Sequence, residues 1–346
     1  MHIYYMILVC LVMLSIGKPY TLTVRYVLAG ILLFVVAALR GESVDRDYQG
    51  YIERYADAVY GDFWNIEPSF RLLATAVHYF FDDPFWLFLI YAGLGISIKL
   101  VAFKQLTNHK MTTLVVYFSG FFLLWEMTQI RVAVAGGIML LSVAALRDRN
   151  AIKYFIFCSL ASLFHYAALV MFLLYFINGS SINRLLYILL VPAAGLLLKA
   201  SVDIVDLAGF APIELVELKI RSYETYKDVS DNIYNYVFLA RCLFAYFLLA
   251  NADLLAGKNR YFVVLLKLYF LGLFCHLAFA SVPAVSFRLG EFFLVVEVLL
   301  IPMQIDVFKS KPIGYFAAVM ASLIFLMFSL HYQELLGPFY VSPAFT

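Results

Sequence analysis

Hydrophobic residues fill most of this chain in runs of about 15 to 25 positions, and short polar stretches separate one run from the next. A run of this length, folded as a helix, crosses the roughly 30 Å of hydrocarbon in a bilayer. We therefore predict ten helical spans, near residues 3–17, 21–39, 85–103, 112–125, 130–146, 182–199, 233–251, 261–282, 285–305 and 313–331. With a further apolar run at 152–177, the pattern predicts an all-α polytopic membrane protein with about 10–12 transmembrane helices.

The composition excludes a soluble globular protein. Apolar residues make up 64% of the chain and charged residues 14%, whereas soluble domains carry about 25% charged residues. The four cysteines all lie within apolar runs, so neither a disulfide framework nor a thiolate metal site is expected. We expect a single integral membrane domain over residues 1–346.

Basic residues identify one side of the predicted spans. The short loops carry eleven Lys and Arg residues but only three acids, and by the positive-inside rule such loops are cytoplasmic. Alternation then places two long polar segments, 40–84 and 200–232, on the extracytoplasmic side. Each of them is rich in acids, and residues 41–84 hold nine acids against three arginines.

The apolar run at 152–177 leaves two interpretations open. The loops at 147–153 and 178–184 both look cytoplasmic, so the run would enter the membrane and return as a short helical hairpin. Its tip would then lie near His165. The alternative is one tilted helix of 26 residues, which would violate the charge bias of a later loop.

Polar residues at the ends of the spans gather on the predicted outer side. They are Arg40, Glu126, Gln129, Arg131, His165, Arg288 and Glu291. A charge within a span costs several kcal/mol unless it is paired or faces a cavity. Several polar residues at one depth in the membrane therefore predict a shared, outward-facing aqueous cavity.

These residues also have structural explanations. Arg40 could reach the interface, as long basic side chains at helix ends do. Glu126 with Arg131, and Arg288 with Glu291, could form structural ion pairs; the second pair has i, i+3 spacing on one helix face. Lys99 is interpreted in the same way, as a snorkelling or packing charge.

The acidic segment at 40–71 is the most distinctive part of the chain, with seven of its 23 acids between Glu42 and Glu67. Tyr48, Tyr51 and Tyr55 would lie on one face of a short amphipathic helix, suited either to interfacial anchoring or to stacking on sugars. Asp45-x-Asp47 is formally a D-x-D, which in many glycosyltransferases binds a divalent metal through carboxylate oxygens. Because the whole loop is acidic, we expect no metal there.

The residue types on the outer side suit one chemistry. Guanidinium groups bind phosphate bidentately and stay charged, as a lipid diphosphate at the interface requires. Carboxylates and tyrosines bind sugar hydroxyls, and a histidine or carboxylate can take a proton from an attacking hydroxyl. The set points to glycosyl transfer between polyprenyl-linked donors and acceptors.

Five short elements carry a resemblance to a known family: Arg40-Gly41, Asp45-x-Asp47-Tyr48 with Tyr51 and Tyr55, Glu67-Pro68-x-Phe70, Gln129-Ile130-Arg131 before the small-residue stretch VAVAGG, and Ala161-Ser162-Leu163-Phe164-His165-Tyr166. In this order they resemble the EpsG/Wzy-type family of polysaccharide polymerases, over about residues 35–180. One departure is Val132, where the family often has Gln after the arginine.

The resemblance implies a GT-C-like helical fold and a polymerase of O-antigen, exopolysaccharide or capsule chains in the bacterial cytoplasmic membrane, with its active site facing the periplasm or exterior. It would transfer a growing glycan from undecaprenyl diphosphate to a lipid-linked repeat unit. The partners would be these two lipid-linked substrates and membrane lipid, with a chain-length regulator and a flippase as further candidates. No nucleic acid, cofactor or metal is expected.

The site residues follow from this interpretation. The candidate catalytic residues are His165, Asp45, Asp47 and Glu67. The candidate diphosphate ligands are Arg40, Arg131 and Arg288. The candidate sugar contacts are Tyr48, Tyr51, Glu126, Gln129 and Glu291.

Two other functions remain open from the sequence. One is a flippase or transporter for the lipid-linked oligosaccharide, although transporters place charges near the midplane between internal repeats and no repeat is evident. The other is a glycan ligase or a membrane acyltransferase.

Overall fold

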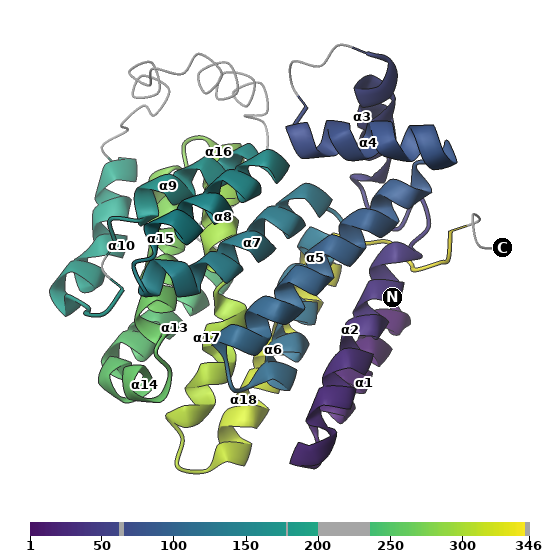
Figure 1. Ribbon diagram of the computed structural model, residues 1–346. Helices are drawn as coiled ribbons and strands as arrows, with labels where there is room; N and C mark the ends of the chain where they lie inside the picture. The colour runs from purple at the N-terminus through teal and green to yellow at the C-terminus, as the bar shows by residue number, and fades with distance from the viewer. Residues whose placement is uncertain (62–65, 178, 200–235, 343–346) are drawn as a thin grey trace. The chain divides into compact units, whose positions relative to one another are not determined.

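The computed structural model describes residues 1–61, 66–177, 179–199 and 236–342 (Figure 1). The predicted segment 200–232 lies outside the described residues. The α-helices are α1 (His2–Ser15), α2 (Leu22–Ala38), α3 (Tyr48–Tyr60), α4 (Pro68–Phe81), α5 (Phe85–Leu106), α6 (Lys110–Tyr117), α7 (Ile130–Arg147), α8 (Ala151–Phe164), α9 (Met171–Leu174), α10 (Arg184–Lys199), α13 (Tyr236–Ala250), α14 (Ala252–Lys258), α15 (Phe262–Ala278), α16 (Pro283–Leu294), α17 (Glu297–Met303) and α18 (Lys311–Met327). Short 3₁₀ or π-helical segments are η1 (Pro19–Thr21), η2 (Phe118–Glu126), η3 (Tyr166–Val170), η4 (Gln304–Asp306) and η5 (Phe328–Tyr332).

The predicted all-α membrane fold is confirmed. The described residues contain helices and two isolated β-bridges, but no strand. In the part of the chain that the structure describes, each of the ten predicted spans overlaps one to three consecutive helical segments. This agreement follows from the bilayer itself, since a spanning segment must satisfy its backbone hydrogen bonds internally and does so as a helix.

Fewer of these segments are continuous spans than the predicted 10–12. Four helical stretches in the described residues are long and apolar enough to cross a membrane: Pro19–Ala38, Phe85–Leu106, Ile130–Arg147 and Lys311–Tyr332. The pair α13–α14, bent by 75°, makes a fifth if it counts as one span. The lower number has two physical causes. Some helices are short, such as the continuous α6 and η2, which extend only from Lys110 to Glu126, and some apolar runs contain a helix break, such as 285–305 between α16 and α17.

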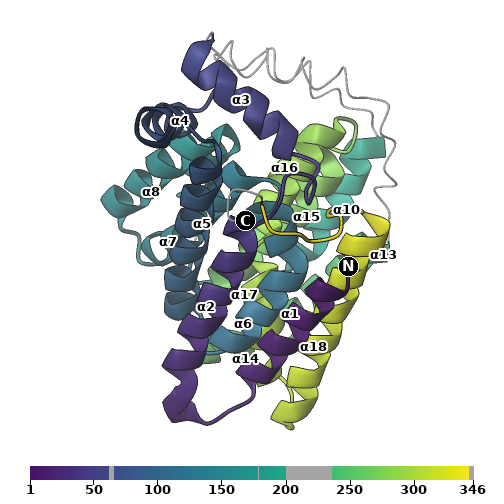
Figure 2. The same cartoon turned by 90° about the vertical axis from the view of Figure 1, so that its right-hand side faces the viewer.

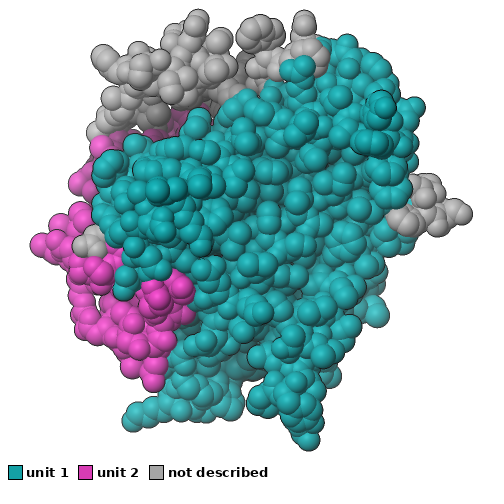
Figure 3. Space-filling view, viewed as in Figure 1, with its two compact units in different colours: residues 1–177, 298–346 teal, residues 178–297 magenta. Residues whose placement is uncertain are grey.

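The chain divides into two compact units where the sequence predicts one membrane domain (Figure 3). Unit 1 comprises Met1–Ile177 and Val298–Thr346, and unit 2 comprises Asn178–Glu297. In unit 2, α15 packs against α10, α13 and α16. In unit 1, α7 packs against α5 and α8 (Figure 2).

Glycines allow α7 to pack closely inside unit 1. The Trp125 ring fills the space that a Cβ on Gly136 would need, and the side chains of Ile98 and Lys99 crowd Gly137. Without a hydrophobic driving force in lipid, such close backbone approach is what favours helix association in a membrane. The VAVAGG stretch is therefore a packing surface, and 83% of α7 is buried.

A buried ion pair joins α5 to η2. Lys99 Nζ donates to Glu126 Oε1 at 2.5 Å and to the Ala133 carbonyl at 2.5 Å, and Tyr117 Oη also donates to Glu126 Oε1. Both charged side chains are 1% exposed. Lys99 is therefore not a snorkelling residue, and Glu126 pairs with Lys99 rather than with Arg131. The buried Glu126 carboxylate therefore has a structural role in joining α5 to η2, and its predicted sugar contact stays a prediction.

The run at 152–177 turns back on itself. After α8, His165 is extended (φ −154°, ψ 124°), and the chain returns through η3 and α9. Tyr154 Oη donates to the Met171 carbonyl at 2.7 Å, which joins the two arms. The structure thus has the helical turn at this run, with His165 at its tip, instead of one long helix.

The first polar segment folds into α3 and α4, which lie together at the end of unit 1 where α5 begins (Figures 1 and 2). The last described residues of the chain run alongside the segment between α2 and α3. Gly337 N donates to the Val44 carbonyl at 2.8 Å, and Gly41 N donates to the Tyr340 carbonyl at 2.9 Å. The C-terminal segment therefore holds the turn that leads into α3.

The buried ion pair gives a stability prediction. Lys99→Met leaves the Glu126 carboxylate without its cation, and breaking a buried pair from one side costs about 3 kcal/mol or more. We expect a clearly lower thermal midpoint for the single variant, measured on the purified protein in detergent.

The double variant Lys99→Met/Glu126→Leu is the matched control. It removes both charges, so most of the lost stability should return. If the double variant is as unstable as the single one, the packing of the Lys99 stem holds the helices together and the ion pair does not.

Candidate functional site

Three segments that are far apart in the sequence meet at Glu67. Glu67 precedes α4, whose first residue is Pro68; proline is favoured there because its fixed φ suits a helix start and no hydrogen bond is lost. Arg131 is the second residue of α7, and His165 follows the last residue of α8. All three belong to unit 1.

One carboxylate contacts both basic residues. Arg131 Nη1 donates to Glu67 Oε2, and His165 Nδ1 lies 3.4 Å from Glu67 Oε1. The second distance is long for a hydrogen bond, as is common for catalytic groups before a substrate binds. A carboxylate beside Nδ1 favours the tautomer that carries its proton there, which leaves Nε2 as the basic nitrogen.

Aromatic rings enclose this contact. The guanidinium carbon of Arg131 lies 5.6 Å from the ring centre of Tyr51 and 5.9 Å from that of Phe70, within cation–π range. Tyr91 of α5 contacts Phe70 at 6.0 Å and Phe164 edge-on at 6.2 Å between ring centres. These rings connect α3, α4, α5 and the tip of the 152–177 turn, and so fix the guanidinium group.

Glu67 and the cations around it are electrostatically coupled. Burial alone would raise the pKa of Glu67, but the adjacent His165 imidazole and the charge of Arg131 lower it to about 2, so Glu67 is ionised at neutral pH. Burial and the like charge of Arg131 lower the pKa of Arg54, whereas the charges of Glu67 and Asp57 act in the opposite direction. Among the described residues, Arg54 forms no ion pair. Arg54 is therefore a second guanidinium group within electrostatic reach of the Glu67–Arg131 pair.

Arg40 and Asp45 form a second, separate pair. Arg40 Nε donates to Asp45 Oδ2 at 2.8 Å, and Asp45 Oδ1 accepts the Asp47 N–H at 3.0 Å. Arg40 lies 4.9 Å over the Phe88 ring and is 2% exposed, so it does not reach the interface by snorkelling. Both Asp45 oxygens accept hydrogen bonds within the protein, so this pair stabilises the turn before α3, and the predicted role of Asp45 as a general base stays a prediction.

The tyrosine face of α3 is turned inward. Tyr48 stacks on Phe88 with 4.6 Å between ring centres and 9° between planes, and Tyr51 meets the same ring edge-on at 6.1 Å. Tyr48, Tyr51 and Tyr55 are all buried. Protein rings therefore contact Tyr48 and Tyr51, and the predicted sugar stacking by these tyrosines stays a prediction.

The remaining predicted residues lie in different places. Asp47 and Gln129 are partly exposed at the N-terminal caps of α3 and α7. Arg288 and Glu291 lie on α16 in unit 2. Their predicted membership of one site with Arg131 stays a prediction.

Sequence reasoning missed two residues of the cluster. Arg54 lies three positions after Tyr51 on α3, a spacing that places both on one helix face, so its participation could have been predicted. Tyr91 lies inside an uninterrupted apolar run, where no local signal separates it from lipid-facing residues.

The donor set of the cluster favours an anion over a metal. In the part of the chain that the structure describes, no group of three His, Cys, Asp or Glu residues could hold a metal ion. Chemically, the cluster can bind an anionic group through guanidinium forks and can present an oriented imidazole as a base.

The Glu67 carboxylate gives a pH-dependent prediction. Its folded pKa of about 2 lies below its ordinary value of 4.5, so the ionised carboxylate stabilises the fold above pH 4.5 by about 3 kcal/mol. This contribution is lost as the pH falls from about 4.5 toward about 2. We expect Glu67→Gln to lower the thermal midpoint at pH 7 and to differ progressively less from the wild type below pH 4.5.

The matched control is Glu53→Gln, on an exposed face of α3. Its thermal midpoint should follow the wild type at every pH. A Glu67→Gln difference that stays constant between pH 7 and pH 3 would contradict the charge pairing.

Comparison with known proteins supplies the family. A model of the EpsG family matches residues 23–341. No curated protein and no solved structure matches the chain, so the GT-C-like arrangement stays a prediction. Since the family match covers nearly the whole chain, this multi-pass membrane protein belongs to the EpsG family, and this membership supports a polymerase-like role in polysaccharide synthesis.

Proposed function

We propose that the protein is a polysaccharide polymerase that transfers a growing glycan from undecaprenyl diphosphate to a lipid-linked repeat unit. The reaction would take place at the outer face of the bacterial cytoplasmic membrane. Family membership supports the class of reaction. The observation that carries the site is the contact of Arg131 and His165 with one Glu67 carboxylate, beside the additional cation Arg54.

The cluster matches the charge demand of this transfer. An acceptor hydroxyl attacks the anomeric carbon of the donor sugar, a glycosidic bond forms, and the bond to the diphosphate oxygen breaks. The departing diphosphate gains negative charge, which Arg131 and Arg54 would stabilise. The hydroxyl proton would pass to His165 Nε2, because Glu67 holds the opposite side of the ring.

Glu67 takes a different role from the one that the sequence suggested. With its pKa lowered to about 2, it is too weak a base to accept a proton at neutral pH. It would instead orient His165 and stabilise the imidazolium form, as the carboxylate does in other carboxylate–histidine pairs. Arg40, Arg288, Asp47, Gln129 and Glu291 remain candidate substrate contacts.

The proposal predicts the result of a complementation experiment. In a deletion strain carrying the wild-type gene, a gel of surface polysaccharide should show a ladder of repeats. Arg131→Ala and His165→Ala should reduce the ladder to single repeat units at normal protein levels, since loss of a general base alone costs about 100-fold or more in rate. Arg131→Lys should give short ladders, because it keeps the charge without the bidentate fork.

Two residues of α4 outside the Glu67 cluster supply matched controls: the half-buried His78 and the exposed Arg71. His78→Ala and Arg71→Ala should give full-length ladders. Long polymer from both Arg131→Ala and His165→Ala would contradict the site. A deletion strain with no repeat units on surface lipid would indicate a flippase, and polymer held on the carrier lipid would indicate a ligase.

A further inference from the structure

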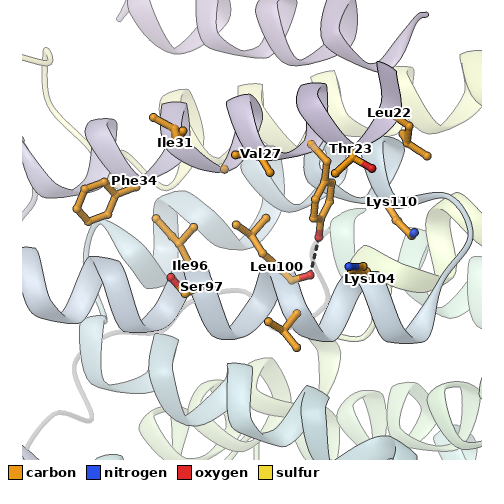
Figure 4. A pocket seen from close by; sticks show the side chains of 13 residues that line it. Leu22, Thr23, Val27, Ile31, Phe34, Ile96, Ser97, Leu100, Lys104 and Lys110 are labelled. Carbon is orange, nitrogen blue, oxygen red and sulfur yellow. Dashed lines mark hydrogen bonds between the residues drawn. The ribbon is translucent and has the colours of Figure 1, made fainter. Parts of the chain in front are cut away.

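A cavity of about 390 Å³ lies between α2 and α5 of unit 1 (Figure 4). Its walls are mainly aliphatic, and two lysines lie at one end. The lining residues are Leu22, Thr23, Tyr26, Val27, Gly30, Ile31, Phe34, Ile96, Ser97, Leu100, Val101, Lys104 and Lys110. Tyr26 Oη donates to the Leu100 carbonyl at 2.7 Å, so the polar group of this wall is already satisfied.

The cavity and the candidate catalytic site lie at opposite ends of α5. Phe88 and Tyr91 belong to the first two turns of this helix, whereas Lys104 belongs to its last turn. From Phe88 to Lys104 the helix rises about 24 Å at roughly 1.5 Å per residue. The lysine end is the side that the basic loops identify as cytoplasmic.

The dimensions fit the lipid of one leaflet. Along α2 the lining extends from Leu22 to Phe34, a rise of about 18 Å. One leaflet contributes about half of the roughly 30 Å hydrocarbon thickness. The apolar wall is thus long enough for one acyl chain, and the charged end coincides with the level of a headgroup.

The two lysines supply the headgroup contact. Lys104 is exposed and Lys110 is half-buried, and no ion pair joins either of them to an acid among the described residues. Figure 4 shows both ammonium groups, together with Thr23, at the same end of the cavity. Two cations at the end of an apolar groove are complementary to a phosphate that carries a hydrocarbon chain.

We propose that this cavity is a binding site for an anionic phospholipid of the cytoplasmic leaflet. One acyl chain lies between α2 and α5, and the phosphate lies against Lys104 and Lys110. The site is independent of the proposed polymerase reaction, since it shares no residue with the Glu67 cluster.

Native mass spectrometry of the purified full-length protein tests the proposal. After delipidation, the wild type should retain added phosphatidylglycerol in preference to phosphatidylcholine. Each lysine near an anionic lipid contributes about fivefold in affinity, so Lys104→Gln/Lys110→Gln should weaken phosphatidylglycerol binding by about tenfold or more. Val27→Trp, which fills the groove, should abolish retention.

Matched controls separate a specific site from general lipid contact. Lys309→Gln removes an exposed lysine outside the cavity, and Val24→Trp adds the same ring on α2 away from the lining. Both should bind phosphatidylglycerol as the wild type does. Equal retention by all variants, or equal retention of the two lipids, would overturn the proposal. Displacement of phosphatidylglycerol by millimolar inorganic phosphate would assign the lysines to free phosphate instead.

Discussion

Desolvation of charge is the constraint on which unit 1 depends. A charged group taken from water into a helix package costs several kcal/mol unless a partner and further hydrogen bonds compensate it. Among the described residues, unit 1 meets this requirement with three buried carboxylate–cation pairs: Asp45 with Arg40, Glu126 with Lys99, and Glu67 with Arg131. Two of these pairs join segments that are far apart in the sequence, and the Asp45–Arg40 pair closes the turn between α2 and α3. The pairs therefore hold these helix ends together.

The three pairs differ in how completely they are satisfied, and this difference separates structure from chemistry. Two internal donors engage Oε1 of the buried Glu126 carboxylate, and both oxygens of Asp45 accept hydrogen bonds. Around Glu67, by contrast, Arg131 and His165 share one carboxylate, and Arg54 lies within electrostatic reach. A fully hydrogen-bonded pair stabilises the fold, whereas a pair with a further cation nearby retains electrostatic potential for a ligand. Carboxylate–cation pairs therefore serve both fold stability and the proposed ligand binding within unit 1.

The sequence predicts the helices well and the pairings poorly. An apolar run in a bilayer has few alternatives to a helix, so span positions follow from hydropathy alone. A pairing depends on which helix ends meet: Glu126 lies five positions before Arg131 but pairs with Lys99, 27 positions earlier. Likewise, the periodicity identified the aromatic face of α3, yet it could not tell whether rings of other helices or a ligand would cover that face.

Helix α5 relates the two ends of unit 1. Its 22 residues extend about 33 Å, close to the roughly 30 Å thickness of the hydrocarbon core. Its first turns carry the rings that support Arg131, and its last turn carries a lysine of the α2–α5 cavity. A rigid element of this length can hold both features at the two interfaces of a bilayer at once. The proposed diphosphate-binding cluster requires a fixed depth at its interface, and a continuous helix that is as long as the hydrocarbon core is thick supplies that depth.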